Sequence, residues 1–217
     1  MTLLHTCDYG FGNIHNVERA LIRVGAEVRR CVSPDELDGA KGVVIPGVGA
    51  FGDCISALRA RGFERPIMEL AESGTWILGI CVGMQILATH GEEFGFHKGL
   101  DLVPGTVSIV PDKTSNDESL KRPHIGWSNL YSYSDNWDGT LLENVSHDSP
   151  VYFVHSYQLH PKDSNQLLAY ARYGGLDITA AVRRERIYGV QFHPEKSGET
   201  GLQILKSFVR QVTSFQK

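Results

Sequence analysis

A repeating pattern of apolar runs, glycine turns and amphipathic helices constrains the N-terminal half of the chain most strongly. Leu3–Cys7 is a short apolar run that stops at Asp8-Tyr9-Gly10-Phe11-Gly12. Apolar side chains then recur at helical spacing from Ile14 to Val24, and Gly25 follows, which indicates a strand, a glycine loop and a helix in that order. Because strands that alternate with helices usually pair in parallel, the pattern predicts a parallel sheet covered by helices.

The rest of the chain adds elements of both kinds. The apolar runs Val28–Val32, Gly42–Ile45 and Trp76–Ile80 predict strands, and the stretches Cys54–Arg61 and Arg65–Glu72 predict helices. After Pro104, polar loops separate five β-rich pieces, which are Val107–Val110, Val151–His155, Leu167–Ala171, Thr179–Val182 and Ile187–Phe192. We expect these pieces to extend the sheet with some antiparallel pairing. The polar segment Asp112–Arg122 is interpreted as a surface loop, with an ordered partner contact as the alternative, and Gly201–Val212 is predicted to be an amphipathic helix.

Length and composition fit one globular domain over residues 1–217. The chain has 217 residues, of which 41% are hydrophobic and 21% charged, and its formal net charge is -4. This balance gives no general attraction for nucleic acid or for an anionic membrane, so neither is expected as a partner. The N-terminus lacks a basic region followed by a long apolar run, and no stretch reaches the roughly 18 apolar residues of a membrane span. We therefore expect a soluble, cytoplasmic protein.

Four cysteines are spread singly along the chain, at positions 7, 31, 54 and 81. No Cys-x-x-Cys pair occurs, which argues against a disulfide framework and against a zinc site. Cys7, Cys31 and Cys54 are interpreted as buried structural thiols. Cys81 differs because of its neighbours.

Cys81 is the centre of Gly79-Ile80-Cys81-Val82-Gly83, directly after a buried run and before Met84, Ile86 and Leu87, which indicate a helix. A sharp turn between strand and helix pushes the central side chain outward, and flanking glycines allow the two elements to approach closely. A thiol at the start of a helix is also favoured as thiolate. The pattern predicts a cysteine nucleophile, with a buried structural cysteine as the alternative.

A histidine and a carboxylate follow a second apolar strand near the C-terminus. Tyr188–Phe192 leads into His193-Pro194-Glu195, and extended geometry would place His193 and Glu195 on one face. One imidazole nitrogen could then be held by Glu195 while the other faces a thiol or substrate, as in a catalytic triad. The alternative is a surface His-x-Glu without a role. A zinc site fits less well because one Cys, one His and one Glu fall short of the usual ligand spacing.

Six motifs accompany these residues in the order of a known family. They are Asp8–Asn13, Pro46–Gly52, Gly79–Gln85, Pro123–Trp127, Tyr152–Tyr157 and Gln191–Ser197. Together they resemble the triad-type class I glutamine amidotransferases, and among these the glutaminase subunits of imidazole glycerol phosphate synthases. The resemblance spans nearly the whole chain. It implies a flavodoxin-like α/β fold with a central, mostly parallel sheet, helices on both faces and added antiparallel strands.

The resemblance also implies the chemistry of the site. Cys81 would attack the side-chain amide of L-glutamine and form a thioester, with His193 as acid and base and Glu195 as its orienting carboxylate. The implied oxyanion donors are the amide of Val82 and the loop with Gly47, Val48 and Gly49. The implied glutamine-binding residues are Gln85, Ser156 and Tyr157. The resemblance implies no metal and no cofactor.

A second subunit is implied because one amidotransferase domain without a glycine-rich phosphate loop offers no site for an ammonia acceptor. In the family the partner is a (β/α)8 barrel cyclase, which uses the ammonia to make imidazole glycerol phosphate and aminoimidazole carboxamide ribotide in histidine biosynthesis. The implied interface residues are Asn13, Trp127, Tyr152 and Lys196. Trp127 as a core aromatic and Lys196 as a solvated side chain are the alternatives.

Two positions depart from the family's pattern, and other functions stay open. Ser128 stands where the family usually has asparagine, and Asn16 stands where serine is common. The first alternative keeps the chemistry and changes the acceptor, as in paralogous subunits that supply ammonia to nucleotide-sugar amidotransferases of surface polysaccharide synthesis. A cysteine peptidase with the same elbow and a non-catalytic binding subunit are the others.

Overall fold

Parallel strands form the centre of the molecule. The structure, a computed structural model, describes residues 2–133 and 136–214. Strands in the order β2-β1-β3-β4-β13 pair in parallel, and they are β1 (Thr2–Cys7), β2 (Ala26–Cys31), β3 (Gly42–Gly47), β4 (Trp76–Cys81) and β13 (Ile187–Val190). The predicted parallel sheet is confirmed. Because β13 pairs with β4, the residues that follow these two strands meet at one edge of the sheet.

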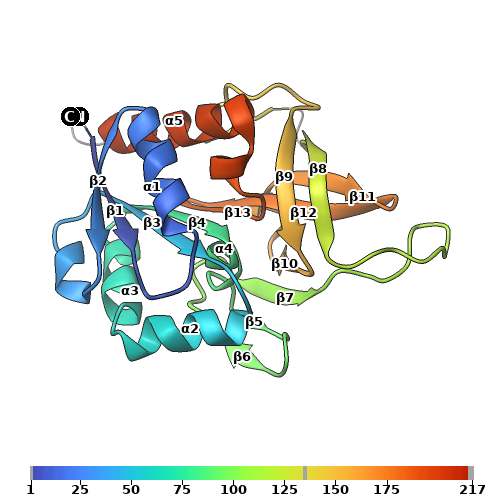
Figure 1. The fold of residues 1–217 in the computed structure, drawn as a ribbon, viewed down its shortest axis with the longest axis horizontal. Coiled ribbons are helices and arrows are strands. Elements are labelled where there is room, and N and C mark those ends of the chain that lie inside the picture. Colours follow the sequence, from blue (N-terminus) through green and yellow to red (C-terminus); the bar gives the residue numbers. More distant parts are fainter. Residues whose placement is uncertain (1, 134–135, 215–217) are drawn as a thin grey trace.

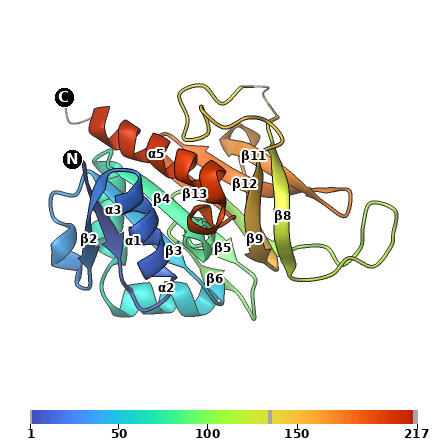
Figure 2. The ribbon, with the colours of Figure 1, turned by 45° about the horizontal axis from the view of Figure 1, so that its top comes forward.

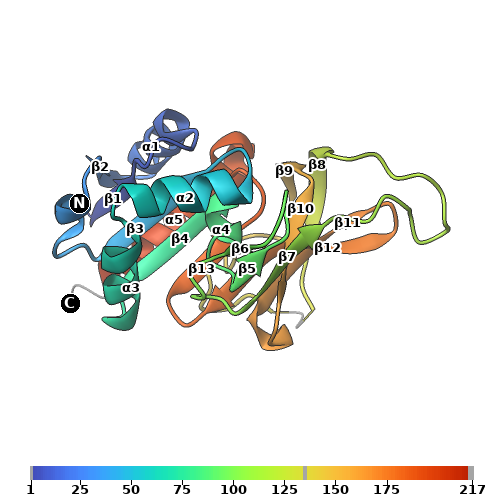
Figure 3. The ribbon, with the colours of Figure 1, turned by 90° about the horizontal axis from the view of Figure 1, so that it is seen from below.

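Helices cover both faces of this parallel region, as predicted (Figure 1, Figure 3). α1 (Ile14–Arg23) and α5 (Gly198–Ser214) lie on one face, and α2 (Phe51–Ala60) and α3 (Glu64–Glu72) lie on the other. Figure 2 shows α5 and α1 side by side over the sheet. α5 buries Ile204, Phe208 and Val212 along one stripe, which is the pattern of a helix that covers a core.

Antiparallel strands continue the sheet beyond β13, as expected. Among the described residues the full sheet has nine strands, and the added ones follow in the order β12 (Leu176–Arg184), β11 (Leu167–Tyr173), β8 (His124–Tyr131) and β9 (Pro150–His155). β8 was not predicted, because its polarity runs against its burial: the polar His124 is buried, while the apolar Ile125 and Trp127 are exposed. Segment 112–122, between β7 (Gly105–Ile109) and β8, is a surface loop with an isolated bridge between Lys113 and Ser119.

A second, four-stranded sheet corrects one prediction. The run Val107–Val110 was expected to extend the main sheet, but it contributes to β7, which pairs antiparallel with β10 (Tyr157–Pro161). β5 (His90–Gly91) and β6 (His97–Lys98) complete this small sheet. The prediction was wrong because the choice of partner depends on β10, which begins where the chain turns away from β9 at Ser156. Short 3-10 turns are η1 (Pro34–Leu37), η2 (Ser164–Gln166) and η3 (Pro194–Lys196).

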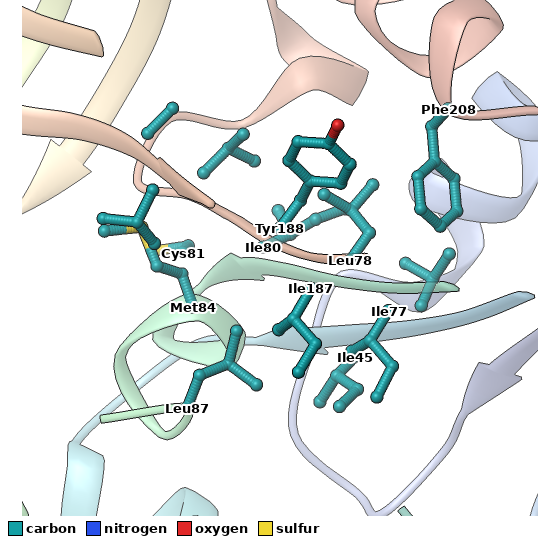
Figure 4. Packing of buried hydrophobic residues seen from close by; sticks show 14 of the residues in the cluster. Ile45, Ile77, Leu78, Ile80, Cys81, Met84, Leu87, Ile187, Tyr188 and Phe208 are labelled. Carbon is teal, nitrogen blue, oxygen red and sulfur yellow. The ribbon is translucent and has the colours of Figure 1, made fainter. Parts of the chain in front are cut away.

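Buried side chains pack around β4 and β13. Ile77, Leu78 and Tyr188 are fully buried between the helix layers, and Figure 4 shows Cys81 and Met84 at the end of this packed row. Each buried side chain of this size contributes roughly 1.5–3 kcal/mol, so the end of β4 rests on a rigid base. Within residues 2–133 and 136–214, the helices are too short or too polar to cross a lipid bilayer.

Candidate active site

A strained turn at the end of β4 presents Cys81. Its backbone has φ 56 and ψ -114, a region that costs a non-glycine residue about 1–3 kcal/mol. The glycines beside it are required by space: a Cβ on Gly83 would lie 1.8 Å from the Ile45 carbonyl oxygen, and one on Gly79 would lie 2.5 Å from the Gly83 oxygen. The predicted elbow is therefore confirmed, with both glycines allowing the strand and the following turn to touch.

The helix after the elbow is shorter than predicted. α4 (Val82–Gln85) is a single turn, and Ile86 and Leu87 continue in looser turns. Since a helix dipole acts through several aligned peptide units, this short turn is a weak source of positive potential, and the expectation that a helix dipole favours the thiolate is not supported. The groups around the sulfur are instead Gln191, whose Nε2 donates to Sγ at 3.7 Å, and the Val154 carbonyl oxygen 3.9 Å from Sγ.

His193 and Glu195 form a buried pair. The distance from His193 Nδ1 to Glu195 Oε1 is 2.8 Å, and the two side chains are 3% and 0% exposed. The pairing was predicted, but the reason given for it was wrong: β13 ends at Val190, and Glu195 lies in the 3-10 turn η3 that His193 caps. Ser197 fixes this turn, because its Oγ donates to the His193 carbonyl at 2.6 Å and accepts from the Tyr152 amide at 2.9 Å.

The charge on His193 is controlled by its two neighbours. Burial lowers the pKa of His193, but hydrogen bonding and charge interaction with Cys81 and Glu195 outweigh burial and raise that pKa to about 9. The imidazole therefore holds a proton at neutral pH. Its Nε2 is buried and has no hydrogen-bond partner of normal geometry among the described residues. Such a nitrogen can give a proton to a group that enters the site.

A cavity of about 260 Å³ lies in front of the sulfur. Most of the predicted site residues line it, and they are Val48, Gly49, Cys81, Val82, Gln85, Ser156, Tyr157 and His193. Two do not. Gly47 is buried against α4, where a Cβ would lie 2.5 Å from the Gly83 nitrogen, and Glu195 lies behind His193. The structure thus brings a thiol and an imidazole to one small cavity that is partly open to solvent.

The loop that holds Val48 and Gly49 forms an exposed wall of the cavity. Both residues are exposed, and Gly49 has φ +97, with the nearest atoms to an added Cβ 3.8 Å away. Space is therefore no obstacle there, whereas the backbone conformation requires glycine. Such a loop can turn an amide toward or away from the cavity without rebuilding the core.

Several residues of the site were not predicted from the sequence. Glu93 lines the cavity and accepts a hydrogen bond from the Phe51 amide at 2.8 Å, and burial raises its pKa. His155 also lines the cavity, and Gln191 reaches the sulfur. His155 and Gln191 belong to motifs that resemble the amidotransferases, which was the available signal. Glu93 follows Gly91-Glu92, where nothing in the sequence distinguishes it from a surface carboxylate.

Gln85 is tied into the wall of the cavity. Its Nε2 donates to the Tyr157 carbonyl and to Gln191 Oε1, both at 3.0 Å. Because both N–H groups of the amide are used inside the protein, the group that Gln85 can offer to a ligand is its carbonyl oxygen. Ser156 joins β9 to β10, and Tyr157 is the first residue of β10.

The predicted interface residues are exposed or half-buried. Trp127 is 56% exposed, so the alternative of a core aromatic is wrong, and it packs edge-to-face on Tyr152 with ring centres 5.9 Å apart. Lys196 is exposed in η3, next to Glu195. Asn13 is half-buried at the start of α1, where its Oδ1 accepts from Asn16 at 2.9 Å.

Comparisons with known proteins agree with this geometry. The profile of the family "Glutamine amidotransferase class-I" matches residues 5–212. The imidazole glycerol phosphate synthase subunit HisH 1 of Legionella pneumophila (strain Paris) is 43% identical over 212 residues, which are 97% of this chain and 100% of that protein. The subunit HisH of Syntrophotalea carbinolica is 43% identical over 202 residues, 93% of this chain and 96% of that protein. A solved glutamine amidotransferase covers 97% of this chain and 98% of its own with a TM-score of 0.72 and 18% identity, so the fold is shared.

Proposed function

The chain belongs to the class I glutamine amidotransferases, in the branch of the HisH subunits of imidazole glycerol phosphate synthase, and we propose from this premise that it hydrolyses L-glutamine at Cys81. The released ammonia passes to a (β/α)8 barrel cyclase subunit that makes imidazole glycerol phosphate and aminoimidazole carboxamide ribotide in histidine biosynthesis. One observation carries the proposal: the only strained thiol among the described residues faces a small cavity together with an imidazole that a buried carboxylate holds. The match over residues 5–212 supports a single domain.

The geometry supports a two-step reaction. The thiolate of Cys81 attacks the side-chain amide carbon of glutamine, and the protonated His193 gives its proton to the departing nitrogen, which leaves as ammonia. A thioester between Cys81 and the glutamyl group remains. His193, now neutral, takes a proton from water, and the hydroxide displaces Cys81 to release glutamate. Glu195 holds Nδ1 throughout, so that Nε2 keeps facing the reacting atoms.

Backbone amides at the cavity suit the oxygen that becomes negative in each step. The amide of Val82 starts α4 beside the sulfur, and the Val48-Gly49 loop follows Gly47, which pairs with Cys81, and lines the same cavity. Donors fixed in this way typically contribute about 100-fold to 1000-fold in kcat. The accessible Val48-Gly49 wall is the part that a partner could reorient, which supports a glutaminase that depends on its partner's state.

The cavity also suits the amino-acid end of glutamine. Glu93 supplies a carboxylate, which would pair with the α-ammonium group of the substrate. Ser156 and Tyr157 also line the cavity, and Gln85 provides its carbonyl oxygen. A cavity of about 260 Å³ fits one amino acid, whereas a peptidase requires an extended groove, so this shape does not favour the peptidase alternative.

We infer a partner subunit because the sequence has no glycine-rich phosphate loop that would bind an ammonia acceptor. Exposed Trp127, its neighbour Tyr152 and Lys196 are near the elements that carry the site, β9 and η3, which supports an interface on this side. The identity of 43% to HisH subunits over almost the full length favours the histidine pathway over the nucleotide-sugar alternative.

The test is an assay of glutamate release. We expect little turnover by the chain alone, a large increase with the barrel cyclase and its acceptor ligand, and none in Cys81→Ala. The matched control is Cys31→Ala, which removes a buried thiol from β2, away from the cavity, and which should behave like the unaltered protein. Appreciable glutamate release by Cys81→Ala would reject the proposal. If a nucleotide-sugar amidotransferase activates the chain and the cyclase does not, the acceptor in this proposal changes and the glutaminase chemistry stays.

A further inference from the structure

A buried pair of histidines lies beside the proposed site and has no part in the triad chemistry. His124 Nδ1 and His155 Nε2 are 3.0 Å apart, and the two residues are 2% and 6% exposed. His124 lies on β8 and His155 on β9, directly opposite each other in the register of these strands. His124 Nε2 lies 2.9 Å from Ser128 Oγ, and His155 Nδ1 lies 2.9 Å from the Tyr157 carbonyl oxygen.

The chemistry of these groups fixes where each proton lies. Burial lowers the pKa of His124 to about 4 and that of His155 to about 3, so both rings are neutral at pH 7. A carbonyl only accepts, so Nδ1 of His155 must carry hydrogen, and its Nε2 then accepts from His124. Nδ1 of His124 must therefore carry hydrogen, its Nε2 accepts, and the Ser128 hydroxyl donates. The series has one consistent direction, from Ser128 to the Tyr157 carbonyl.

The Tyr157 carbonyl also connects the hydrogen bonds of the two histidines to the Cys81 sulfur. The Tyr157 oxygen also accepts from Gln85 Nε2 at 3.0 Å, and Gln85 donates to Gln191 Oε1 at 3.0 Å. Gln191 in turn points its own Nε2 at Cys81 Sγ, 3.7 Å away. A continuous series of hydrogen bonds therefore runs from Ser128 on β8 to the nucleophile. Ser128 is half-buried and follows Trp127, which is 56% exposed.

We propose that Ser128, His124 and His155 are positioning residues that hold the Tyr157 wall of the glutamine cavity, and that a subunit bound at Trp127 acts on the cavity through this series. The inference rests on the proposed function and names a regulatory connection within that site. Each neutral ring has one donor and one acceptor, so the loss of the Ser128 hydrogen bond leaves a buried acceptor unpaired and frees the ring to shift. The Tyr157 carbonyl then loses a fixed partner. A partner that shifts β8 against β9 changes the contact between His124 and His155, which joins the two strands.

The first test observes the protons and does not depend on activity. Nitrogen NMR of the full chain labelled at histidine distinguishes Nδ1–H from Nε2–H in each ring. We expect both His124 and His155 as neutral Nδ1–H forms at pH 7. An Nε2–H form in either ring would reverse the hydrogen-bond direction and overturn the proposal, whatever the chain catalyses.

The second test measures glutamine hydrolysis in the complex with the barrel cyclase and its acceptor ligand. Ser128→Ala removes the terminal donor, and we expect the KM for glutamine to rise about five-fold, the typical effect of one lost hydrogen bond, with a smaller change in kcat. Ser128→Asn keeps a donor and should restore the KM. Tyr173→Phe is the control, because it removes a hydroxyl bonded to the Lys121 carbonyl and keeps the ring that stacks on His124 at 4.1 Å.

The outcomes separate the two proposals. An unchanged KM in Ser128→Ala, or an equal increase in Tyr173→Phe, would overturn the positioning role while the glutaminase remains. Absence of glutamate release in every protein, including the unaltered one, would reject the proposed function, and the NMR measurement would still decide the arrangement of the histidines.

Discussion

The proton on His193 provides the sharpest quantitative check of the site. A pKa raised from 6.5 to about 9 corresponds to roughly 3 kcal/mol in favour of the charged ring. Burial opposes this shift, so the favourable interaction with Cys81 and Glu195 exceeds that figure. Replacing Cys81 by serine removes one of the two partners, because a hydroxyl stays neutral at ordinary pH. We expect the pKa of His193 to fall by about one unit or more in Cys81→Ser.

The assay is an NMR titration of the labelled imidazole in the unaltered chain, Cys81→Ser and Glu195→Gln. Glu195→Gln should lower the pKa as well, since the amide carries no charge. Glu199→Gln is the matched control: it makes the same chemical change at a side chain 88% exposed on α5, and it should leave the His193 titration where it was. A His193 pKa that is equal in the unaltered chain and in Cys81→Ser would show that the sulfur does not interact with the ring, and the acid and base roles derived above would fail.

Three further outcomes follow from the packing and charges. Gly83→Ala should destabilise the fold by about 3 kcal/mol or prevent folding, because its Cβ would lie 1.8 Å from the Ile45 oxygen; denaturant unfolding measures this. Glu93→Gln should raise the KM for glutamine about ten-fold with little change in kcat, since it removes a charge that binds the ground state and the transition state alike. Acid should weaken the fold: His124 titrates at about 4 when folded and 6.5 when unfolded, so its contribution is complete above 6.5 and declines by up to about 3 kcal/mol as the pH falls toward 4. Urea unfolding of the unaltered chain and of His124→Phe at several pH values measures this loss. An equal loss of stability in both proteins would contradict a contribution from His124.

Features that depend on neighbouring residues were predictable from the sequence. The strand before Cys81 is an apolar run, and the need for Gly79 and Gly83 follows from the sharpness of the turn, so the elbow could be placed to the residue. The helices of the N-terminal half could be placed from their apolar spacing for the same reason. The helix after the elbow was overestimated because apolar side chains at positions 84, 86 and 87 are also compatible with the compact turns that the chain forms.

Features that depend on distant residues were not predictable. The run at Val107 leaves the main sheet because β10, some 50 residues later, provides its partner. The pair of His193 and Glu195 was expected for the wrong reason, because the 3-10 turn that joins them depends on Ser197 and on β9. Glu93 lies between β5 and β6, so its position at the cavity depends on the pairing of the small second sheet. Such contacts result from tertiary packing, which a local pattern does not contain.

The central claim is that Cys81 is the reactive thiol, and covalent labelling tests it most directly. A diazoketone analogue of glutamine alkylates a thiolate that binds it, with loss of dinitrogen. Cys81 lines the cavity, whereas Cys7, Cys31 and Cys54 are fully buried, and burial raises the pKa of each of these three thiols. Peptide mass spectrometry of the folded chain with its cyclase should find one label, on Cys81, and slower labelling after Glu195→Gln. A label on another cysteine, or an unmodified Cys81 after long exposure, would contradict the account.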